Sequence, residues 1–255
     1  MRTETREGVL ELCLEEPPCN EIGSRLLDAL EGALGAVASA RAILVYSALP
    51  AGFCAGADLR ELYREGASLP TEERVARVRR FLERIHRVFA LLDASPAPVV
   101  AAVHGICFGG GLEFALCADV VVADKGARFA FPELRLGLIP GFGGIPRLRR
   151  DVGNAVVRDL LLTGRSLNAT RAHECGLVGQ LVGEGSALRA ARAAAQQMLK
   201  FDPGTLAAAK PWIKPLCRAE LDDEVAVFLR LFRRPEVQEN LRRFVENQGP
   251  LPYLP

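Results

Sequence analysis

Short apolar runs alternate with longer segments of helical periodicity along this chain, and that alternation restricts its fold more than any other feature. The runs 42–46, 99–103 and 120–123 contain almost only apolar residues. Between the first two runs, apolar residues recur at helical spacing from Val75 to Leu92. Buried strands are continuous apolar runs of this length, because they are covered on both faces. The pattern predicts an α/β fold.

The other elements are predicted from their caps and their periodicity. Residues 9–14 have the composition of a strand, and a helix is expected from Ser24, as its N-cap, to Val37. Thr71 begins the long helix that two prolines end. Toward its end the chain is predicted to be helical, over the ranges 187–199, 205–214, 221–232 and 237–245.

Composition and charge exclude several classes of protein. The chain has 255 residues, of which 49% are hydrophobic, so a large core is available. Its formal net charge is +1, whereas a nucleic-acid binder needs a basic face or stripe. No run approaches the roughly 18 consecutive apolar residues of a membrane span. The first residues are polar and mixed in charge, unlike a signal or transit peptide. We expect a cytoplasmic protein with no nucleic-acid partner and no membrane contact.

Cysteine and histidine side chains form no disulfide or metal-binding pattern. The seven cysteines are scattered without a Cys-x-x-Cys pair, and the three histidines lack a spacing such as His-x-x-x-His. We therefore expect reduced thiols and no metal site.

Three segments stand out for their small residues, at 47–59, 104–113 and 131–144. In the second, Gly109, Gly110 and Gly111 lie where a strand leads into a helix. Glycines there let the backbone approach a ligand, and the free N–H groups at the helix start can bind a phosphate or a developing oxyanion. The consecutive glycines match neither a P-loop nor the Rossmann motif. A tight structural turn would use the same residues, so the triplet alone leaves both readings open.

Two glutamates lie in apolar surroundings within these segments. Glu113 falls one turn into the helix after the glycines, and Glu133 lies between Pro132 and an apolar run. A buried carboxylate is costly unless it has a partner or its pKa rises. A helix-capping role would explain either residue. Two such groups beside an anion-binding backbone suit paired acid and base chemistry on a carbonyl compound.

The three segments carry motifs in a fixed order: Phe-Cys-Ala-Gly-Ala-Asp-Leu at 53–59, Gly-Gly-Gly-Leu-Glu at 109–113, and Pro-Glu-x-x-Leu-Gly-Leu-Ile-Pro-Gly-x-Gly-Gly at 132–144. In this combination they closely resemble the crotonase superfamily, also called enoyl-CoA hydratase/isomerase. The resemblance implies an α/β, crotonase-like fold of repeated β-β-α units with a C-terminal helical trimerisation region. Residues 1–190 would form the crotonase core with the thioester-binding and catalytic site, and residues 191–255 the helical oligomerisation region.

The resemblance also implies roles for individual residues. The backbone N–H groups of Ala57 and Gly110 would form an oxyanion hole for a thioester carbonyl. Glu113 and Glu133 align with the two catalytic glutamates of the hydratases. Glu113 would activate water for attack at C3 of an enoyl thioester, and Glu133 would deliver a proton to C2. The expected substrate-binding residues are Ala55, Asp58, Gly109, Pro140 and Gly141. The acyl-CoA substrate brings its own CoA, and no metal or redox cofactor is implied.

A homotrimer or a dimer of trimers is expected. The predicted helix at 221–232 is apolar nearly all round, and such a helix normally buries its second face against something else. We interpret it as packing on its own core and on a neighbouring subunit, with coverage of its own sheet alone as the alternative.

The reaction predicted first is hydration, because two glutamates favour water addition or loss over double-bond isomerisation, which one carboxylate can carry out. An enoyl-CoA isomerase, another crotonase-family reaction on an acyl thioester, and a non-catalytic subunit of the same fold, possibly touching RNA, are the alternatives. Near-zero net charge argues against RNA.

Two departures from the family pattern concern the substrate. Ile145-Pro146 replace the Thr-Gln of many hydratases, and Glu15-Glu16 stand where relatives often carry a cation near the CoA phosphates. The candidates for supplying that positive charge are Arg25, Lys210 and Lys214. An acyl carrier in place of CoA stays open.

Overall fold

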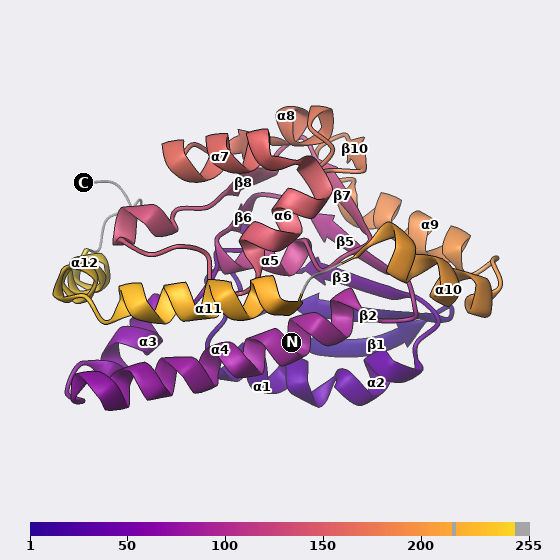
Figure 1. Ribbon diagram of the computed structural model, residues 1–255. Coiled ribbons are helices and arrows are strands. Elements are labelled where there is room, and N and C mark those ends of the chain that lie inside the picture. The colour runs from indigo at the N-terminus through magenta and orange to yellow at the C-terminus, as the bar shows by residue number, and fades with distance from the viewer. Residues whose placement is uncertain (216–217, 248–255) are drawn as a thin grey trace.

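Two β-sheets form the centre of the molecule, and helices pack around them (Figure 1). The computed structural model describes residues 1–215 and 218–247. The larger sheet has the strand order β1-β2-β3-β5-β7-β10 and is parallel except for β1. Its strands are β1 (Arg2–Arg6), β2 (Val9–Leu14), β3 (Ile43–Ser47), β5 (Val99–Val103), β7 (Val120–Asp124) and β10 (Gln180–Val182).

The smaller sheet has the order β4-β6-β8-β9 and is parallel except for β9. Its strands are β4 (Gly52–Cys54), β6 (Ile106–Phe108), β8 (Arg128–Ala130) and β9 (Leu167–Asn168).

Three successive strand pairs, β3/β4, β5/β6 and β7/β8, each place the first strand in the larger sheet and the second in the smaller one. The helices that follow them are α3 (Leu59–Gly66), α4 (Thr71–Asp93), α5 (Gly110–Ala115), the 3₁₀ helix η1 (Glu133–Leu136) and α6 (Gly144–Val152). The predicted fold of repeated β-β-α units is thereby confirmed. Because each unit brings a loop and a helix start to the same region between the sheets, the three motifs are brought together there.

The apolar runs of the larger sheet are buried on both faces, as predicted. Ile43 and Val45 belong to the main core, whereas Leu44 faces a second cluster on the other side of the sheet. Helix α9 (Ala187–Met198) covers that side with Ala191 and other alanines. Two-sided burial explains why these strands show no polar alternation.

The remaining helices are α1 (Ser24–Gly32), α2 (Leu34–Ser39), α7 (Asn154–Thr163), α8 (Ala169–Glu174), α10 (Pro203–Ile213), α11 (Arg218–Phe232) and α12 (Pro235–Glu246). Helices α9 to α12 agree with the predicted ranges within a few residues, whereas α7 and α8 were not predicted.

The helix predicted from Ser24 to Val37 is divided at Ala33, where α1 ends and α2 begins. The prediction of Ser24 as N-cap is wrong, because Gly23 occupies the cap position. The Ser24 N–H donates instead to the carboxylate of Glu61 on α3, at 3.1 Å. A distant acid therefore supplies the acceptor that the local sequence lacks.

The C-terminal helices lie partly on the core. Helix α11 packs against α4, α6 and α12, and it buries Phe228, Leu229 and Phe232 within the chain. The predicted boundary between residues 190 and 191 falls inside α9, so the division into core and oligomerisation region stays a prediction. Parts of the predicted second region, at 216–217 and 248–255, lie outside the described residues, as does Cys217. The other six cysteines are free thiols.

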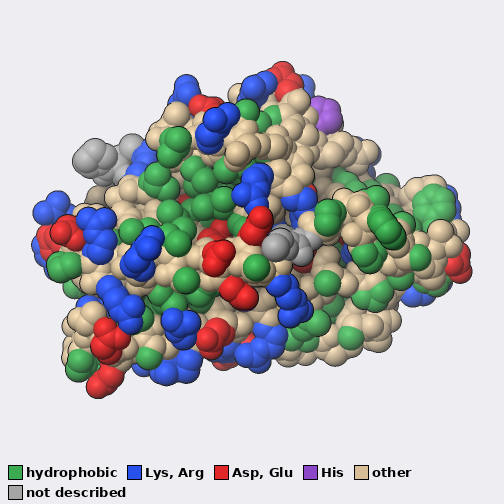
Figure 2. Space-filling model, in the orientation of Figure 1, with side chains coloured by type: hydrophobic (Ala, Val, Ile, Leu, Met, Phe, Trp, Pro, Cys, Tyr) green, Lys and Arg blue, Asp and Glu red, His purple; other side chains and the backbone are tan. Residues whose placement is uncertain are grey.

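Several large apolar side chains near α10 remain exposed on the single chain. The exposed fraction is 86% for Trp212, 74% for Ile213 and 52% for Phe201. Figure 2 shows hydrophobic side chains gathered on the side of the molecule where α10 lies. Within residues 1–215 and 218–247, no helix is long and apolar enough to cross a membrane.

Candidate active site

A small cavity of about 50 Å³ lies between α3, α4, α5 and η1. Its wall is largely apolar, with Leu62, Val78 and Phe81 among the lining side chains. The sequence-predicted site residues that line it are Ala55, Ala57, Gly109, Gly110, Glu113, Glu133 and Gly141. The fold therefore brings seven of the nine predicted residues to one place.

The other two predicted residues do not line this cavity. The Asp58 carboxylate is the N-cap of α3, where it accepts the N–H of Glu61 at 2.9 Å. Pro140 is buried next to the cavity-lining Gly141. Both hold the backbone beside the site, and their predicted role in substrate binding stays a prediction.

Each glycine of the triplet is required for a different reason. Gly109 has a φ of +50°, and a Cβ there would lie 2.6 Å from Oε1 of Glu133. A Cβ on Gly110 would lie 2.5 Å from the ring of Phe142, and one on Gly111 would lie 2.2 Å from the Cys54 carbonyl oxygen. The triplet thus allows the start of α5 to lie against three neighbouring segments.

Two backbone amides are left free beside this helix start. Gly56 and Asp58 both pair with Ile22, through hydrogen bonds of 2.7 and 3.1 Å, and this leaves the intervening N–H of Ala57 without a partner among the described residues. The N–H of Gly110 is in the first turn of α5, where no intrahelical acceptor exists. A Cβ on Gly110 would lie 3.4 Å from the Ala57 nitrogen, so the two amides are neighbours. Together they can donate to one oxygen atom.

Glu113 is buried and is held through one of its oxygens. Its side chain comes from the first turn of α5, and the residue is 2% exposed. Oε1 accepts the N–H groups of Phe142 at 2.7 Å and Gly144 at 2.8 Å. Burial, followed by the charges of Glu224 and Glu133, raises the pKa of Glu113 well above its usual range. Oε2 makes no hydrogen bond to the described residues, so it is available to a ligand.

Glu133 approaches the same cavity from η1. Its Oε2 is buried without a hydrogen-bond partner in the described part of the chain. Burial raises the pKa of Glu133 to about 8. A buried polar atom without a partner is rare in proteins. Here the unpaired atom and the raised pKa describe a carboxyl group that is protonated at neutral pH and able to donate.

A third buried acid, Glu224 on α11, was not predicted from the sequence. It is 6% exposed, and its two oxygens accept the N–H groups of Gly143 at 2.7 Å and Ile145 at 2.9 Å. Burial raises the pKa of Glu224 to about 7. The sequence does contain a signal, because Leu221, Glu224 and Phe228 share one helix face at spacings of three and four.

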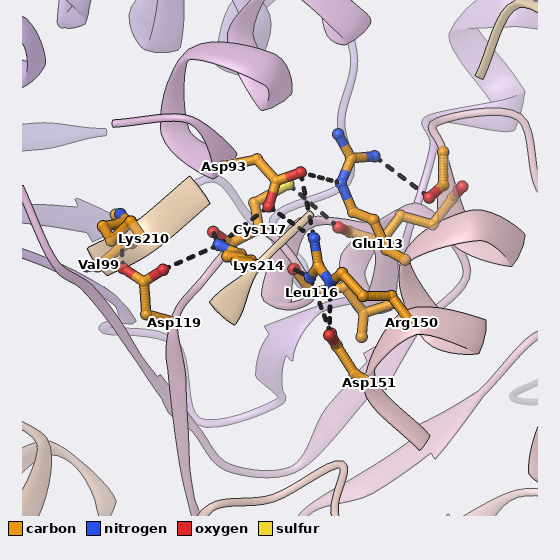
Figure 3. Close-up of polar contacts among 12 residues, drawn as sticks. Asp93, Val99, Glu113, Leu116, Cys117, Asp119, Arg150, Asp151, Lys210 and Lys214 are labelled. Carbon is orange, nitrogen blue, oxygen red and sulfur yellow. Dashed lines mark hydrogen bonds and ion pairs between the residues drawn. The ribbon is translucent and has the colours of Figure 1, made fainter. Parts of the chain in front are cut away.

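A cluster of buried ion pairs lies at the C-terminal end of α5, where Arg150 donates to the carbonyl of Leu116 (Figure 3). Asp93 at the end of α4 pairs with Arg147 at 3.0 Å, Arg150 at 3.1 Å and Lys214 at 2.9 Å. Asp119 joins it by pairing with Lys214 at 3.2 Å and with Lys210 at 2.8 Å. The prediction that Lys210 and Lys214 supply charge for a CoA phosphate is wrong, since both are committed to buried carboxylates.

Arg25, the third candidate for the phosphates, is exposed and pairs with Glu16 at 3.2 Å. Among the described residues, no group of three or more His, Cys, Asp or Glu side chains could hold a metal ion.

Comparisons with known proteins show the family and the fold of this chain. The family model for enoyl-CoA hydratase/isomerase matches residues 4–251. A probable mitochondrial enoyl-CoA hydratase 2 of Arabidopsis thaliana is 34% identical over 252 residues, which are 96% of this chain and 81% of that protein. The 2,3-dehydroadipyl-CoA hydratase of Escherichia coli K12 is 32% identical over 252 residues, 96% of this chain and 95% of that protein.

Among solved structures, an enoyl-CoA hydratase from Bacillus halodurans superposes with a TM-score of 0.85 over 94% of this chain and 98% of that one. At 23% sequence identity, this likeness concerns the fold.

Proposed function

Because this chain belongs to the enoyl-CoA hydratase/isomerase family, we propose that it adds water across the 2,3 double bond of an enoyl thioester, or catalyses the reverse dehydration. The observation that carries the proposal is one cavity lined by two buried carboxyl groups and by two residues with free backbone amides. Hydration of a conjugated thioester needs these four groups: a base, an acid and two donors to the carbonyl oxygen.

The thioester oxygen is held by the N–H groups of Ala57 and Gly110. Attack at C3 moves negative charge onto that oxygen, and each amide then donates to an enolate rather than to a neutral carbonyl. A single donor of this kind is typically worth about 3–4 kcal/mol of transition-state stabilisation. Because both amides belong to fixed backbone, they need no reorganisation as the charge develops.

The two carboxyl groups divide the proton transfers. Glu113 accepts a proton from water as the water oxygen bonds to C3, and Glu133 gives its proton to C2. Glu113 gains one proton and Glu133 loses one, so the protein gains none overall, and the site returns to its starting state when one proton passes from Glu113 to Glu133, directly or by way of solvent. The pKa of about 8 keeps Glu133 protonated at neutral pH, which suits the acid. Burial raises the pKa of Glu113 as well, but the N–H groups of Phe142 and Gly144 act against this rise by stabilising its carboxylate form, the form in which Glu113 acts as the base.

We propose a CoA thioester as the substrate, with no metal or redox cofactor. We also propose that the chain forms a homotrimer or a dimer of trimers and that it is located in the cytoplasm. The exposed Trp212, Ile213 and Phe201 support self-association, because apolar side chains of this size are normally covered. Light scattering of the purified protein tests the assembly: a trimer or hexamer is expected, and a monomer at micromolar concentration would contradict it.

Activity is tested with a panel of short, long, branched and aromatic 2-enoyl-CoAs. Hydration is measured as the loss of absorbance of the conjugated double bond. We expect turnover of at least one substrate, and no turnover across the panel would exclude the hydratase assignment.

The same assay separates hydration from isomerisation. A 3-enoyl-CoA should not gain conjugation, and both Glu113→Gln and Glu133→Gln should abolish activity. An isomerase would convert the 3-enoyl substrate and would tolerate Glu113→Gln.

A further inference from the structure

We propose that Glu224 is a positioning residue for the reaction: it fixes residues 142–145 so that their amides hold the base Glu113 in its working orientation. The inference rests on the proposed function, because it assigns a role toward the proposed base. Glu224 lies on α11, which follows the sheets and the catalytic motifs in the chain, and its side chain does not line the cavity.

The four consecutive amides of residues 142–145 are divided alternately between two acids. Glu113 accepts from Phe142 and Gly144 with one oxygen, and Glu224 accepts from Gly143 and Ile145 with one oxygen each. Successive amides of the segment therefore point to opposite sides, toward α5 and toward α11. Neither set can move without moving the other, since the four amides share one backbone.

This segment is also the start of α6. A helix leaves its first N–H groups without intrahelical acceptors. Gly143 is the N-cap of α6, and the amides of Gly143, Gly144 and Ile145 are all accepted by the two glutamates. The next residue, Pro146, has no N–H to satisfy. The proline that departs from the family pattern thus lies where a backbone donor is not needed.

Carbonyl groups of this segment and of the preceding Gly141 accept hydrogen bonds from Arg147 and His86. Nη1 of Arg147 donates to the carbonyls of Phe142 at 2.8 Å and Gly143 at 3.2 Å. Nε2 of His86 on α4 donates to the carbonyl of Gly141 at 2.8 Å. With its carbonyls fixed, the segment depends on Glu224 to hold the amides that face α11.

A shift of this segment would reach the site by two routes. The donors to Oε1 of Glu113 would move, and so would the Phe142 ring, which lies directly over Gly110 of the oxyanion hole. Both routes affect groups that act during the chemical step. Removing Glu224 should therefore reduce kcat and leave KM nearly unchanged.

Glu224 also influences the charge on Glu113. The ionisable groups facing Glu224 are Glu113 on α5, Glu133 on η1 and Arg147 on α6. The negative charge of Glu224 raises the pKa of Glu113. A neutral side chain in its place should lower that pKa, so that the base stays ionised to lower pH. The acid limb of the kcat profile should move to lower pH.

The test compares Glu224→Gln with Glu220→Gln on the same helix. Glu220 is exposed and pairs with Arg149 of α6, so its variant breaks an α11–α6 contact that does not reach the site. Glutamine at 224 has one acceptor oxygen, so one of the two amides loses its partner. We expect kcat to fall at least tenfold with KM within twofold, and the acid limb to shift downward. Glu220→Gln should change neither.

Amide hydrogen exchange of a peptide covering residues 142–145 gives a readout that does not depend on turnover. Exchange should accelerate in Glu224→Gln, and a Glu224→Asp variant should restore part of both protection and kcat. If wild type turns over and Glu224→Gln keeps its kcat, its acid limb and its exchange rates, the positioning role is excluded. The positioning role would also be excluded if Glu224→Gln lost kcat only in proportion to its loss of thermal stability, while the acid limb of its pH profile stayed in place. If wild type has no hydratase activity, the proposed function fails. In that case, amide exchange rates that are equal in wild type and Glu224→Gln would separately exclude the positioning role of Glu224.

Discussion

Two groups of acids lie near α6, and the pKa values of Glu113 in one group and Asp93 in the other are shifted in opposite directions. On the cavity side, Glu113 and Glu224 accept backbone amides and lie near Glu133, with Arg147 as the neighbouring cation. At the C-terminal end of α5, Asp93 and Asp119 are surrounded by Arg147, Arg150, Lys210 and Lys214. Burial is similar, since Glu113 is 2% and Asp93 is 6% exposed.

The charges beside each acid, rather than the extent of its burial, determine the direction in which its pKa is shifted. Burial raises the pKa of Glu113, and two nearby acids raise it further. Burial also acts to raise the pKa of Asp93, but the positive charges of Lys214, Arg147 and Arg150 outweigh it and lower the pKa. Glu133 and Glu224, with pKa values raised to about 8 and about 7, can exchange protons near neutral pH, whereas Asp93 stays ionised and joins α4, α6 and α10. The number of cations beside a buried acid therefore distinguishes the acids proposed for chemistry from those that stabilise the structure.

The largest expected effect separates the two groups by activity. Glu113→Gln and Glu133→Gln should each reduce kcat of hydration by about 10²–10⁴, because each removes a positioned proton donor or acceptor. Both variants should keep the unfolding midpoint of wild type or exceed it, since they remove an acid from an environment that disfavours its charge. Enzyme assays with thermal unfolding of the same samples test this. A variant that lost activity only because it unfolded would contradict the assignment.

The second prediction breaks the ion-pair group. Asp93→Asn leaves three buried cations facing a neutral side chain, and loss of one partner of such a group typically costs about 3–5 kcal/mol of unfolding free energy. Urea unfolding measures the change. The matched control is Glu174→Gln, which removes an exposed pair with Arg171 and should leave the midpoint nearly unchanged. Equal stability of Asp93→Asn and wild type would show that the cluster does not stabilise the fold.

The sequence predicted some strands of this fold and missed others. The strands of the larger sheet are predicted because burial on two faces leaves continuous apolar runs. Strand β1 (Arg2–Arg6) was missed because it is an exposed edge strand of polar residues. The strands β4, β6 and β8 were missed because three residues are too few to show a period.

The candidate site was predictable where its residues lie in local motifs. Glu113 follows its glycines within one turn, so its place at a helix start could be deduced from spacing. Glu224 and its acceptor role could not, because its partners Gly143 and Ile145 are remote in the chain and meet it only through the packing of α11 on α6. For the same reason Lys210 and Lys214 were assigned to a ligand, when Asp93 and Asp119 had already been brought to them by the fold.

The third prediction concerns the pH dependence of the cavity acids. Glu133 must be protonated to donate to C2, and its pKa is about 8. The kcat/KM of hydration should therefore fall about tenfold per pH unit above that value. Hydration takes up no net proton, so its equilibrium constant does not depend on pH, and kcat/KM of dehydration should fall over the same range. Initial rates in both directions between about pH 6 and pH 10 provide the measurement. A kcat/KM of hydration that does not fall above about pH 8 would exclude Glu133 as the proton donor.

The smallest expected effect compares how the stability of the two groups depends on pH. Glu133 has a folded-state pKa raised to about 8, so the stability associated with its protonated form is complete at low pH and is lost as pH rises toward 8. Asp93 has a lowered pKa, so its contribution is present above the ordinary aspartate pKa and is lost as pH falls through the folded value. Relative to wild type, Glu133→Gln should gain in unfolding temperature as pH rises, whereas Asp93→Asn should recover only in acid. Differential scanning calorimetry at several pH values measures both slopes, and slopes of the same sign would contradict the division between proton-exchanging and permanently charged acids.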